Sequence, residues 1–239
     1  MNQLKVNNIS KTFGSGDEEK KALNNVSFTI DEGECVVIGG ENGSGKSVMM
    51  NIIAGLEEPD SGSIESFSKI GLVFQEAETQ ILGETPREDI AFGPKNLGWK
   101  KQQVHDAVEK ALKLTGLDGK ADYSARFLSG GEKRRLAVAC MLAMDLPVII
   151  FDEPYANLDY SGVKQVNELI KELKSGKKTV IILTHEIEKC LALSDRFIVL
   201  FRGEKVFDGK SESGLEENLE KWNIRNPLNS YTKFQDLVW

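Results

Sequence analysis

Cysteines, long apolar runs and basic charge are all scarce in this sequence, and each scarcity excludes a class of protein. The three cysteines, Cys35, Cys140 and Cys190, are too widely spaced for a disulfide framework or a metal cluster, so we expect them to fill the core. The longest apolar runs, VIIF at 148–151 and VIIL at 180–183, are much shorter than the roughly 18 residues that span a bilayer. The chain is therefore not expected to cross a membrane itself.

Charge and length narrow the possibilities further. Acidic residues outnumber basic ones by 37 to 30, for a net charge of -7, which argues against a surface that binds nucleic acid or anionic lipid. The opening residues, MNQLKVNNIS, lack the apolar stretch of a signal peptide, so we expect a cytoplasmic protein. With 239 residues, of which 40% are hydrophobic, the chain is long enough to bury a core.

The hydrophobic pattern predicts an α/β fold. LKVNNIS, VSFTI and ECVVIGG predict short strands in the first third, followed by a helix after residue 47 and a strand at GLVFQ. From about residue 79 to 143 the pattern is mostly helical, with amphipathic helices at 100–117 and 130–145. Beyond residue 147 the strands VIIF, TVIILT and RFIVLF alternate with helical stretches at 161–176 and 186–193, which is typical of a parallel sheet. In the last thirty residues, Trp222, Tyr231, Phe234 and Trp239 suggest a tail that packs against the rest.

A glycine-rich motif, GENGSGKS at 40–47, lies between a predicted strand and a predicted helix. Gly43 and Gly45 allow successive backbone N–H groups to turn inward and hold phosphate oxygens at the positive end of the helix. Lys46 is then placed to reach the β- and γ-phosphates, and the Ser47 hydroxyl to bind Mg²⁺. The alternative is an ordinary glycine-rich turn. The expected nucleotide-binding residues here are Gly40, Glu41, Asn42, Gly43, Ser44, Gly45, Lys46, Ser47 and Val48.

Two adjacent carboxylates follow the apolar strand VIIF, in VIIFDEP at 148–154. This is the carboxyl end of the strand, where ligands bind in open α/β sheets. We expect Asp152 to hold hydrated Mg²⁺ and Glu153 to orient and deprotonate an attacking water. An Asp-Glu pair at a strand end is also a common turn and cap, but a neighbouring phosphate loop makes that alternative weaker.

The pentapeptide LSGGE at 128–132 leads directly into a helix. Together with GENGSGKS, VIIFDEP and the TH pair at 184–185, it resembles the ATP-binding cassette (ABC) ATPases over nearly the whole chain. In that family two cassettes face each other head to tail, and each nucleotide lies between the phosphate loop of one and the signature of the other. A Ser-Gly-Gly sequence alone would more simply cap a helix, whereas here a hydroxyl and N–H groups suit a γ-phosphate. The residues implied to act in trans are Ser129, Gly130, Gly131 and Glu132.

The resemblance assigns further positions. Gln75 matches the glutamine that reaches Mg²⁺ and water and relays contact with a transmembrane partner, and His185 matches the histidine that contacts the γ-phosphate. Phe13 lies where the family stacks an aromatic ring on adenine, although an ordinary packed ring is the alternative. Asp159 matches an aspartate that crosses the dimer interface, with capping of a helix near Ser161 as the alternative. The implied catalytic residues are Lys46, Glu153 and His185, the metal ligands are Ser47, Gln75 and Asp152, and the cofactors are ATP and Mg²⁺.

Several positions depart from the family pattern. Val48 replaces a threonine whose hydroxyl would bond the α-phosphate, so the chain is expected to bind nucleotide about ten-fold or more weakly unless something compensates. Glu132 replaces glutamine and would repel a polyphosphate, although the helix dipole favours it. Tyr155 and Tyr160 replace a threonine and a proline. None of these changes touches a residue implied to act in catalysis, so hydrolysis is expected to survive.

The resemblance implies one cassette domain over 1–239: a P-loop α/β fold with a mostly parallel core sheet, an N-terminal antiparallel β region, an inserted helical subdomain at about 79–143 and a short tail at about 211–239. The segments at 74–98 and 134–144 resemble the ATPases of energy-coupling factor importers and related cobalt and nickel systems, which take up vitamins or metal ions. The implied partners are a second cassette, identical or a sister subunit, a transmembrane coupling protein and a substrate-binding membrane protein. The location is then peripheral, on the cytoplasmic face of the membrane. Gln75 and the apolar residues that follow it, Ile81, Leu82, Ile90 and Phe92, are expected to line a groove for a coupling helix.

Two other functions stay open. A cassette ATPase that acts on chromosomes or ribosomes has little support, because the chain has no basic excess and no long heptad repeat. A weakly hydrolysing, nucleotide-gated scaffold is suggested by Val48, Glu132 and Tyr155.

Overall fold

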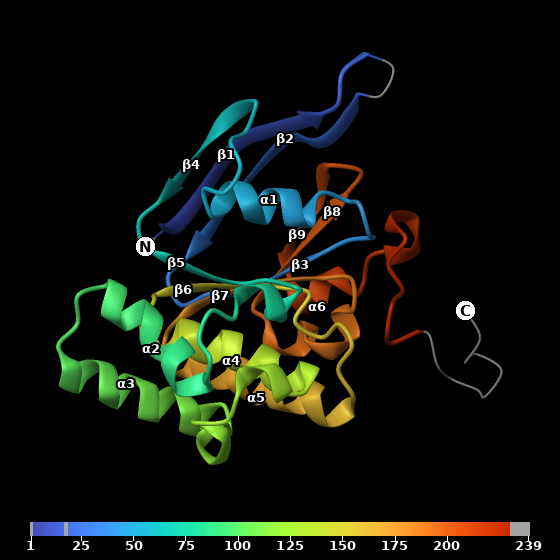
Figure 1. Ribbon diagram of the computed structural model, residues 1–239. Coiled ribbons are helices and arrows are strands. Elements are labelled where there is room, and N and C mark those ends of the chain that lie inside the picture. The colour runs from blue at the N-terminus through green and yellow to red at the C-terminus, as the bar shows by residue number, and fades with distance from the viewer. Residues whose placement is uncertain (1, 17–18, 230–239) are drawn as a thin grey trace.

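Two β-sheets and the helices around them make up the computed structural model, which describes residues 2–16 and 19–229 (Figure 1). The larger sheet has six strands in the order β5-β6-β7-β3-β8-β9. Only β9 is antiparallel to its neighbour, so the prediction of a mostly parallel core sheet is confirmed. Its strands are β3 (Cys35–Gly39), β5 (Ile70–Val73), β6 (Val148–Asp152), β7 (Thr179–Thr184), β8 (Arg196–Phe201) and β9 (Glu204–Lys210).

The smaller sheet is antiparallel, in the order β2-β1-β4, as expected for the N-terminal region. Its strands are β1 (Asn2–Phe13), β2 (Lys20–Asp31) and β4 (Ser61–Ser66). The prediction of short strands was wrong for β1 and β2, which have 12 residues each. Asn8 and Asn25 have positive φ angles at register shifts, so the ladder continues past the interruption in the alternating pattern. The sequence of β4, SGSIES, has one apolar residue and gave no strand signal.

Helices cover both faces of the six-stranded sheet. Helix α1 lies between the two sheets, and α4 and α5 lie on the opposite face (Figure 1). Between β5 and β6 the chain forms α2, α3 and α4, which pack on one another around their own apolar cluster. The helices are α1 (Lys46–Ile53), α2 (Pro86–Asn96), α3 (Lys101–Leu114), α4 (Gly130–Ala143), α5 (Tyr160–Ser175) and α6 (Ser211–Gly214). Short 3-10 turns occupy 77–80, 118–120, 125–127, 187–189, 191–193 and 219–222.

The stretch 186–193 was predicted as a helix, and the structure instead forms two separate 3-10 turns. The backbone of Cys190 lies outside the helical region, with φ -142°. The Lys189 carbonyl, which an α-helix would use internally, accepts a hydrogen bond from Asn167 Nδ2 on α5 at 2.8 Å. Tertiary contacts therefore override the local helical pattern.

The C-terminal segment packs through Trp222, which is 8% exposed, beside Leu219 and Ile224. The Trp222 ring lies 6.3 Å from that of Phe207, which in turn lies 6.0 Å from Phe197. The other aromatic residues expected in the tail, Tyr231, Phe234 and Trp239, lie outside the described residues. Over 2–16 and 19–229, no helix combines the length and the apolar character that a membrane crossing requires.

Replacing Trp222 by alanine should lower the free energy of unfolding by about 3–5 kcal/mol, because a buried ring leaves a cavity that the core closes only in part. Urea denaturation measures this change. Phe67→Ala is the matched control, since that ring is 58% exposed, and it should change the free energy by less than about 1 kcal/mol. Equal effects of the two substitutions would contradict the anchoring role of Trp222.

Candidate nucleotide-binding site

The turn from β3 into α1 has backbone angles that require glycine. Gly40, Gly43 and Gly45 all have positive φ angles. A Cβ on Gly45 would approach the Ala22 carbonyl oxygen to 2.6 Å, whereas a Cβ on Gly43 would meet no atom within 4 Å. The missing side chain of Gly45 therefore allows the loop to pack closely against β2, whereas no atom lies close to the corresponding position of Gly43. No side chain caps the start of α1, so the N–H groups of its first turn are free for an anion.

Lys46 lies folded back onto this loop and is 6% exposed. Its Nζ donates hydrogen bonds to the carbonyl oxygens of Gly40 at 2.8 Å and Glu41 at 3.1 Å, and lies 3.8 Å from Glu153 Oε1. Burial lowers the pKa of Lys46, and the charges of Glu153 and Asp152 oppose that shift. The ammonium is thus held by neutral carbonyls that a phosphate oxygen can replace.

Asp152 ends β6 beneath the loop, buried at 6% exposure. Its Oδ1 has no hydrogen-bond partner among the described residues. Burial, and next the charge of Glu153, raise the pKa of Asp152, while the Ser47 hydroxyl lowers it. A buried carboxylate oxygen without a partner, next to a hydroxyl, fits a hard cation such as Mg²⁺, which keeps waters and phosphate oxygens as its other ligands.

Glu153 follows Asp152 with a φ of 46°, an angle that few residues other than glycine adopt. Its N–H donates to the Leu183 carbonyl at 2.8 Å. Its carboxylate accepts from the Thr184 hydroxyl at 2.9 Å and from the His185 N–H at 3.1 Å, and lies 2.9 Å from His185 Nδ1. A carboxylate held in this way can accept a proton from water, with the imidazole fixing its direction.

One cleft of about 310 Å³ brings many of the predicted residues together. It is lined by Phe13, Lys20, Ala22, Asn42, Gly43, Gly45, Lys46, Ser47, Val48, Gln75, Glu153 and His185. Phe13, at the end of β1, is 43% exposed. The predicted residues Gly40, Ser44 and Asp152 lie buried outside this lining. Glu41 also lies outside it, and its Oε2 accepts a hydrogen bond from Asn223 Nδ2 of the C-terminal segment at 2.7 Å.

The predicted signature residues 129–132 are not among those that line this cleft. Ser129 caps α4, since its Oγ accepts from the Glu132 N–H at 3.3 Å and Glu132 Oε2 accepts from the Ser129 N–H at 2.9 Å. Glu132 Oε1 also pairs with Lys120 Nζ at 2.6 Å, and these bonds lower the pKa of Glu132. The expected repulsion between Glu132 and a polyphosphate therefore meets a compensating cation, which the sequence analysis did not identify.

The remaining departures from the family pattern are accommodated within the fold. Tyr155 is fully buried, and its hydroxyl donates to Asn167 Oδ1 at 2.8 Å. Tyr160 is 77% exposed, and Lys164 lies 5.0 Å from its ring centre. Asp159 caps α5, which begins at Tyr160, by accepting the Gly162 N–H at 2.7 Å. Val48 is the one departure that lines the cleft.

Two residues that shape the site were given no role from the sequence, although Thr184 was noted as part of the TH pair. Thr184, which bonds Glu153, ends the strand TVIILT directly before His185, and that position was a usable signal. Arg134, on α4, donates to the main-chain carbonyls of Gln75 and Pro154, and no sequence pattern points to such bonds. His105, the other histidine of the chain, is exposed and lies outside the cleft lining.

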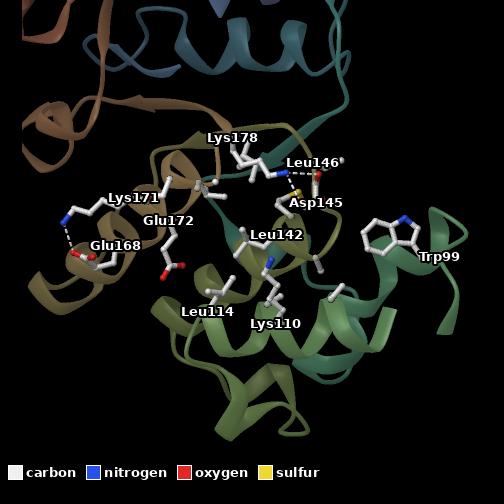
Figure 2. A pocket seen from close by; sticks show the side chains of 18 residues that line it. Trp99, Lys110, Leu114, Leu142, Asp145, Leu146, Glu168, Lys171, Glu172 and Lys178 are labelled. Atoms are coloured by element: carbon white, nitrogen blue, oxygen red, sulfur yellow. Dashed lines mark hydrogen bonds and ion pairs between the residues drawn. The ribbon is translucent and has the colours of Figure 1, made fainter. Parts of the chain in front are cut away.

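Two further hollows lie outside the cleft. A groove of about 740 Å³ is lined by Glu78, Ile81, Leu82, Gly83, Glu84, Thr85, Asp122, Ser124, Ala125, Arg126 and Lys133. Ile81 and Leu82 lie where a groove was expected, whereas Gln75 lines the cleft and Phe92 lies outside the groove lining. The prediction for Ile90 was wrong because it is fully buried in the helical cluster. A hollow of about 590 Å³ separates α3 and α4 from α5, and Figure 2 shows Leu114, Leu142, Leu146 and Glu172 around it.

The sequence of this chain is similar to those of known transporter ATPases. The family model described as ABC transporter matches residues 23–156. The energy-coupling factor transporter ATP-binding protein EcfA2 of Thermotoga maritima is 40% identical over 228 residues, which are 90% of this chain and 85% of that protein. The EcfA2 protein of Clostridium acetobutylicum is 38% identical over 249 residues, which cover 95% of this chain and 87% of that protein.

Solved structures agree with the sequence matches. The ATP-binding cassette MJ0796, in a dimeric post-hydrolysis state bound to ADP and Pi, has a TM-score of 0.79 and 32% identity over 87% of this chain and 98% of its own. The cbiO1 protein from Clostridium perfringens, part of the ABC transporter complex cbiONQ, has a TM-score of 0.80 and 30% identity over 95% of this chain and 96% of its own. The fold, the family match and these relatives agree, and the chain therefore belongs to the ABC transporter family as one of its ATPases.

Proposed function

We propose that this chain is the ATP-hydrolysing subunit of a membrane importer of the energy-coupling factor type, which takes up a vitamin or a metal ion. Two cassettes, identical or sister subunits, bind ATP between them in a head-to-tail dimer, with Mg²⁺ as the metal. The dimer lies at the cytoplasmic face of the membrane, beneath a transmembrane coupling protein and a substrate-binding membrane protein. Each cassette is one domain whose inserted helical subdomain, at about 79–143, presents the signature. No nucleic acid partner is expected.

The observation that supports this function most strongly is the separation of two anion-binding elements within one chain. Lys46 and Ser47 line the cleft, whereas Ser129 and Gly130 lie outside it and are exposed. The cap at the start of α4 uses the N–H groups of Ser129 and Glu132, which leaves those of Gly130 and Gly131 for an anion that comes from outside this chain's own cleft. A second cassette would bring its cleft to this helix. The relatives named EcfA2 support the importer type.

The side chains of the cleft suggest the chemistry. Lys46 would exchange its bonds to the Gly40 and Glu41 carbonyls for phosphate oxygens, which are stronger partners because they are charged. Glu153 would take a proton from the attacking water, with His185 holding the carboxylate and contacting the γ-phosphate. Ser47, Gln75 and Asp152 would hold Mg²⁺, which neutralises charge on the phosphoryl oxygens when bound. Phe13 would stack on adenine.

The groove beside Leu82 is the site we propose for the coupling protein. Leu82 is 68% exposed, and Glu84 and Asp122 place acidic groups on the rim beside Arg126 and Lys133. An amphipathic helix with an apolar contact face and basic flanks would fit this combination. The groove lies on the segment that follows Gln75, so a partner seated there is connected to the cleft along the chain.

The proposed function is tested by measuring phosphate release with Mg²⁺ over a dilution series, and by purifying the chain from membranes. Activity per molecule should fall as the dimer dissociates, and membrane proteins should co-purify. An undiminished rate from a chain that is monomeric at every dilution would contradict the shared site. Negligible hydrolysis even with a sister subunit and the membrane partners would favour the scaffold function instead.

Glu153→Gln should slow hydrolysis by roughly 10²- to 10⁴-fold while ATP binding is preserved, because the amide cannot accept the proton but keeps a similar shape. Steady-state phosphate release and equilibrium binding of ATP measure the two effects separately. Glu188→Gln, at an exposed acidic residue away from the cleft lining, is the control and should hydrolyse at the wild-type rate. Near wild-type turnover by the Glu153 variant would refute the assignment.

Val48→Thr should increase ATP affinity about ten-fold or more, since it restores a hydroxyl at the cleft that can bond a phosphate oxygen. Isothermal titration with ATP and Mg²⁺ measures the dissociation constant. Val48→Ala shortens the side chain without adding a hydroxyl and serves as the control. The explanation is wrong if the threonine and alanine variants bind ATP equally well.

Lys120→Met should slow ATP hydrolysis about two- to five-fold at low ATP through a higher KM. It removes the cation 2.6 Å from Glu132 and leaves only Arg135, at 4.0 Å, to offset that charge near the anion site proposed to act in trans. The Lys120→Met, Glu132→Gln double variant should recover most of the loss, since it removes both charges. Initial rates over a range of ATP concentrations measure KM. A double variant no better than the single one would show that the charge of Glu132 is not the cause.

A further inference from the structure

The guanidinium of Arg134 joins three segments that are far apart in the sequence. Its Nη1 donates to the carbonyl oxygens of Pro154 at 2.8 Å and Ala156 at 2.7 Å, with a longer bond to Glu153 at 3.4 Å. Its Nη2 donates to the Gln75 carbonyl at 2.8 Å. The residue is 7% exposed. One buried side chain of α4 thus holds the main chain after β5 and after β6 together.

The partners of Arg134 are unusual for a buried cation. Among the described residues no carboxylate forms an ion pair with it, and its bonds all go to main-chain oxygens. Burial lowers the pKa of Arg134, and the charge of Glu186 opposes that shift. Because a buried charge without a counter-ion is costly, stability alone is a poor reason for this residue. The planar fork donates from two separate nitrogens in fixed directions, one to each segment, and the single nitrogen of an ammonium group does not reproduce that geometry.

The segment that Arg134 holds is conformationally strained. Glu153 has a φ angle of 46°, which few residues other than glycine adopt, whereas asparagine adopts the 59° of Asn157 more readily. Such angles persist where the surroundings over-determine the backbone. The guanidinium donates hydrogen bonds to three carbonyl oxygens of this turn. It is therefore placed to stabilise the conformation of the turn, which sets the direction of the Glu153 carboxylate.

The packing of α4 differs between its two ends. Near its start, five residues after Ser129, Arg134 bonds it to the turn after β6 and to Gln75. Near its end, Leu142 borders the hollow of about 590 Å³ between α3, α4 and α5 (Figure 2). The helical subdomain is therefore bonded to the cleft near the start of α4. Near its end, α4 packs on the same apolar cluster as α5 and also borders this hollow.

We propose that Arg134 is a positioning residue that keeps Glu153 and Gln75 in register with α4, so that a displacement of the helical subdomain reaches the catalytic carboxylate. The residue touches no substrate in this proposal. Its effect rests on the proposed function, which gives Glu153, Gln75 and the α4 N-terminus their roles. A partner at the groove, or a second cassette at Ser129, would then change hydrolysis through this one side chain.

The test compares Arg134→Lys and Arg134→Gln with Arg135→Lys in the full chain assembled with its partners. Arg135 is the neighbouring arginine, and it bonds the Gln165 side chain on α5 instead of main-chain carbonyls. It also lies 4.0 Å from Glu132 Oε1, and lysine keeps the positive charge there. Both Arg134 variants should lower kcat at least ten-fold, with ATP affinity within about three-fold of wild type because the phosphate loop is untouched. Lysine should not rescue, and Arg135→Lys should retain the wild-type kcat.

The outcomes separate the two proposals. If wild type hydrolyses ATP and Glu153→Gln does not, the proposed function stands, and an unchanged kcat in the Arg134 variants then overturns the positioning role alone. A lower melting temperature with unchanged kcat per folded molecule also overturns it. Amide hydrogen exchange on the wild-type chain gives a measurement that does not depend on a folded variant. Nucleotide should change the protection of 153–157 and of the segment at 75–77 together, and a change in only one of them would contradict the link.

Discussion

The register of three central parallel strands determines where the polar groups of the cleft lie. Gly39 on β3 pairs with Thr184 on β7, and Asp152 on β6 pairs with Leu183 on the same strand. The residues that follow, at 40, 153 and 185, therefore leave the sheet at one edge. Each strand fixes this register by filling two cores, since Ile150 contributes to the cluster beneath α1 and Ile149 to the cluster beside α5. A shift by one residue would exchange these faces.

Charge at this edge is unbalanced in a way that suits the proposed ligands. One buried ammonium, Lys46, faces two buried carboxylates, Asp152 and Glu153, so the three groups sum to one negative charge. Burial disfavours the charges of Asp152 and Lys46, as the raised pKa of Asp152 and the lowered pKa of Lys46 indicate. A divalent cation beside Asp152 would reverse the sign of the edge, and a triphosphate would then bind where a carboxylate pair alone repels it.

The sequence allowed the parallel sheet, the phosphate loop and the paired carboxylates to be predicted because each depends on a short contiguous pattern. It failed where the determining contact is distant. The stretch 186–193 has a helical pattern, but the bond from Asn167 to the Lys189 carbonyl interrupts it. Ile90 is apolar, as expected of a residue that lines a groove, but the packing of three helices buries it. Lys120 and Arg134 meet their partners through tertiary structure, which spacing along the chain does not reveal.

The departures from the family pattern also bear on whether the site can work. A scaffold without hydrolysis was suggested by Val48, Glu132 and Tyr155. Two of these are satisfied inside the chain, because Tyr155 is buried against Asn167 and the charge of Glu132 is paired with Lys120. Only Val48 lines the cleft, where it lacks a hydroxyl for nucleotide but displaces no group that holds Glu153. A change confined to ground-state binding raises KM without removing the proton acceptor, so these substitutions favour a working ATPase of lower affinity over an inert scaffold.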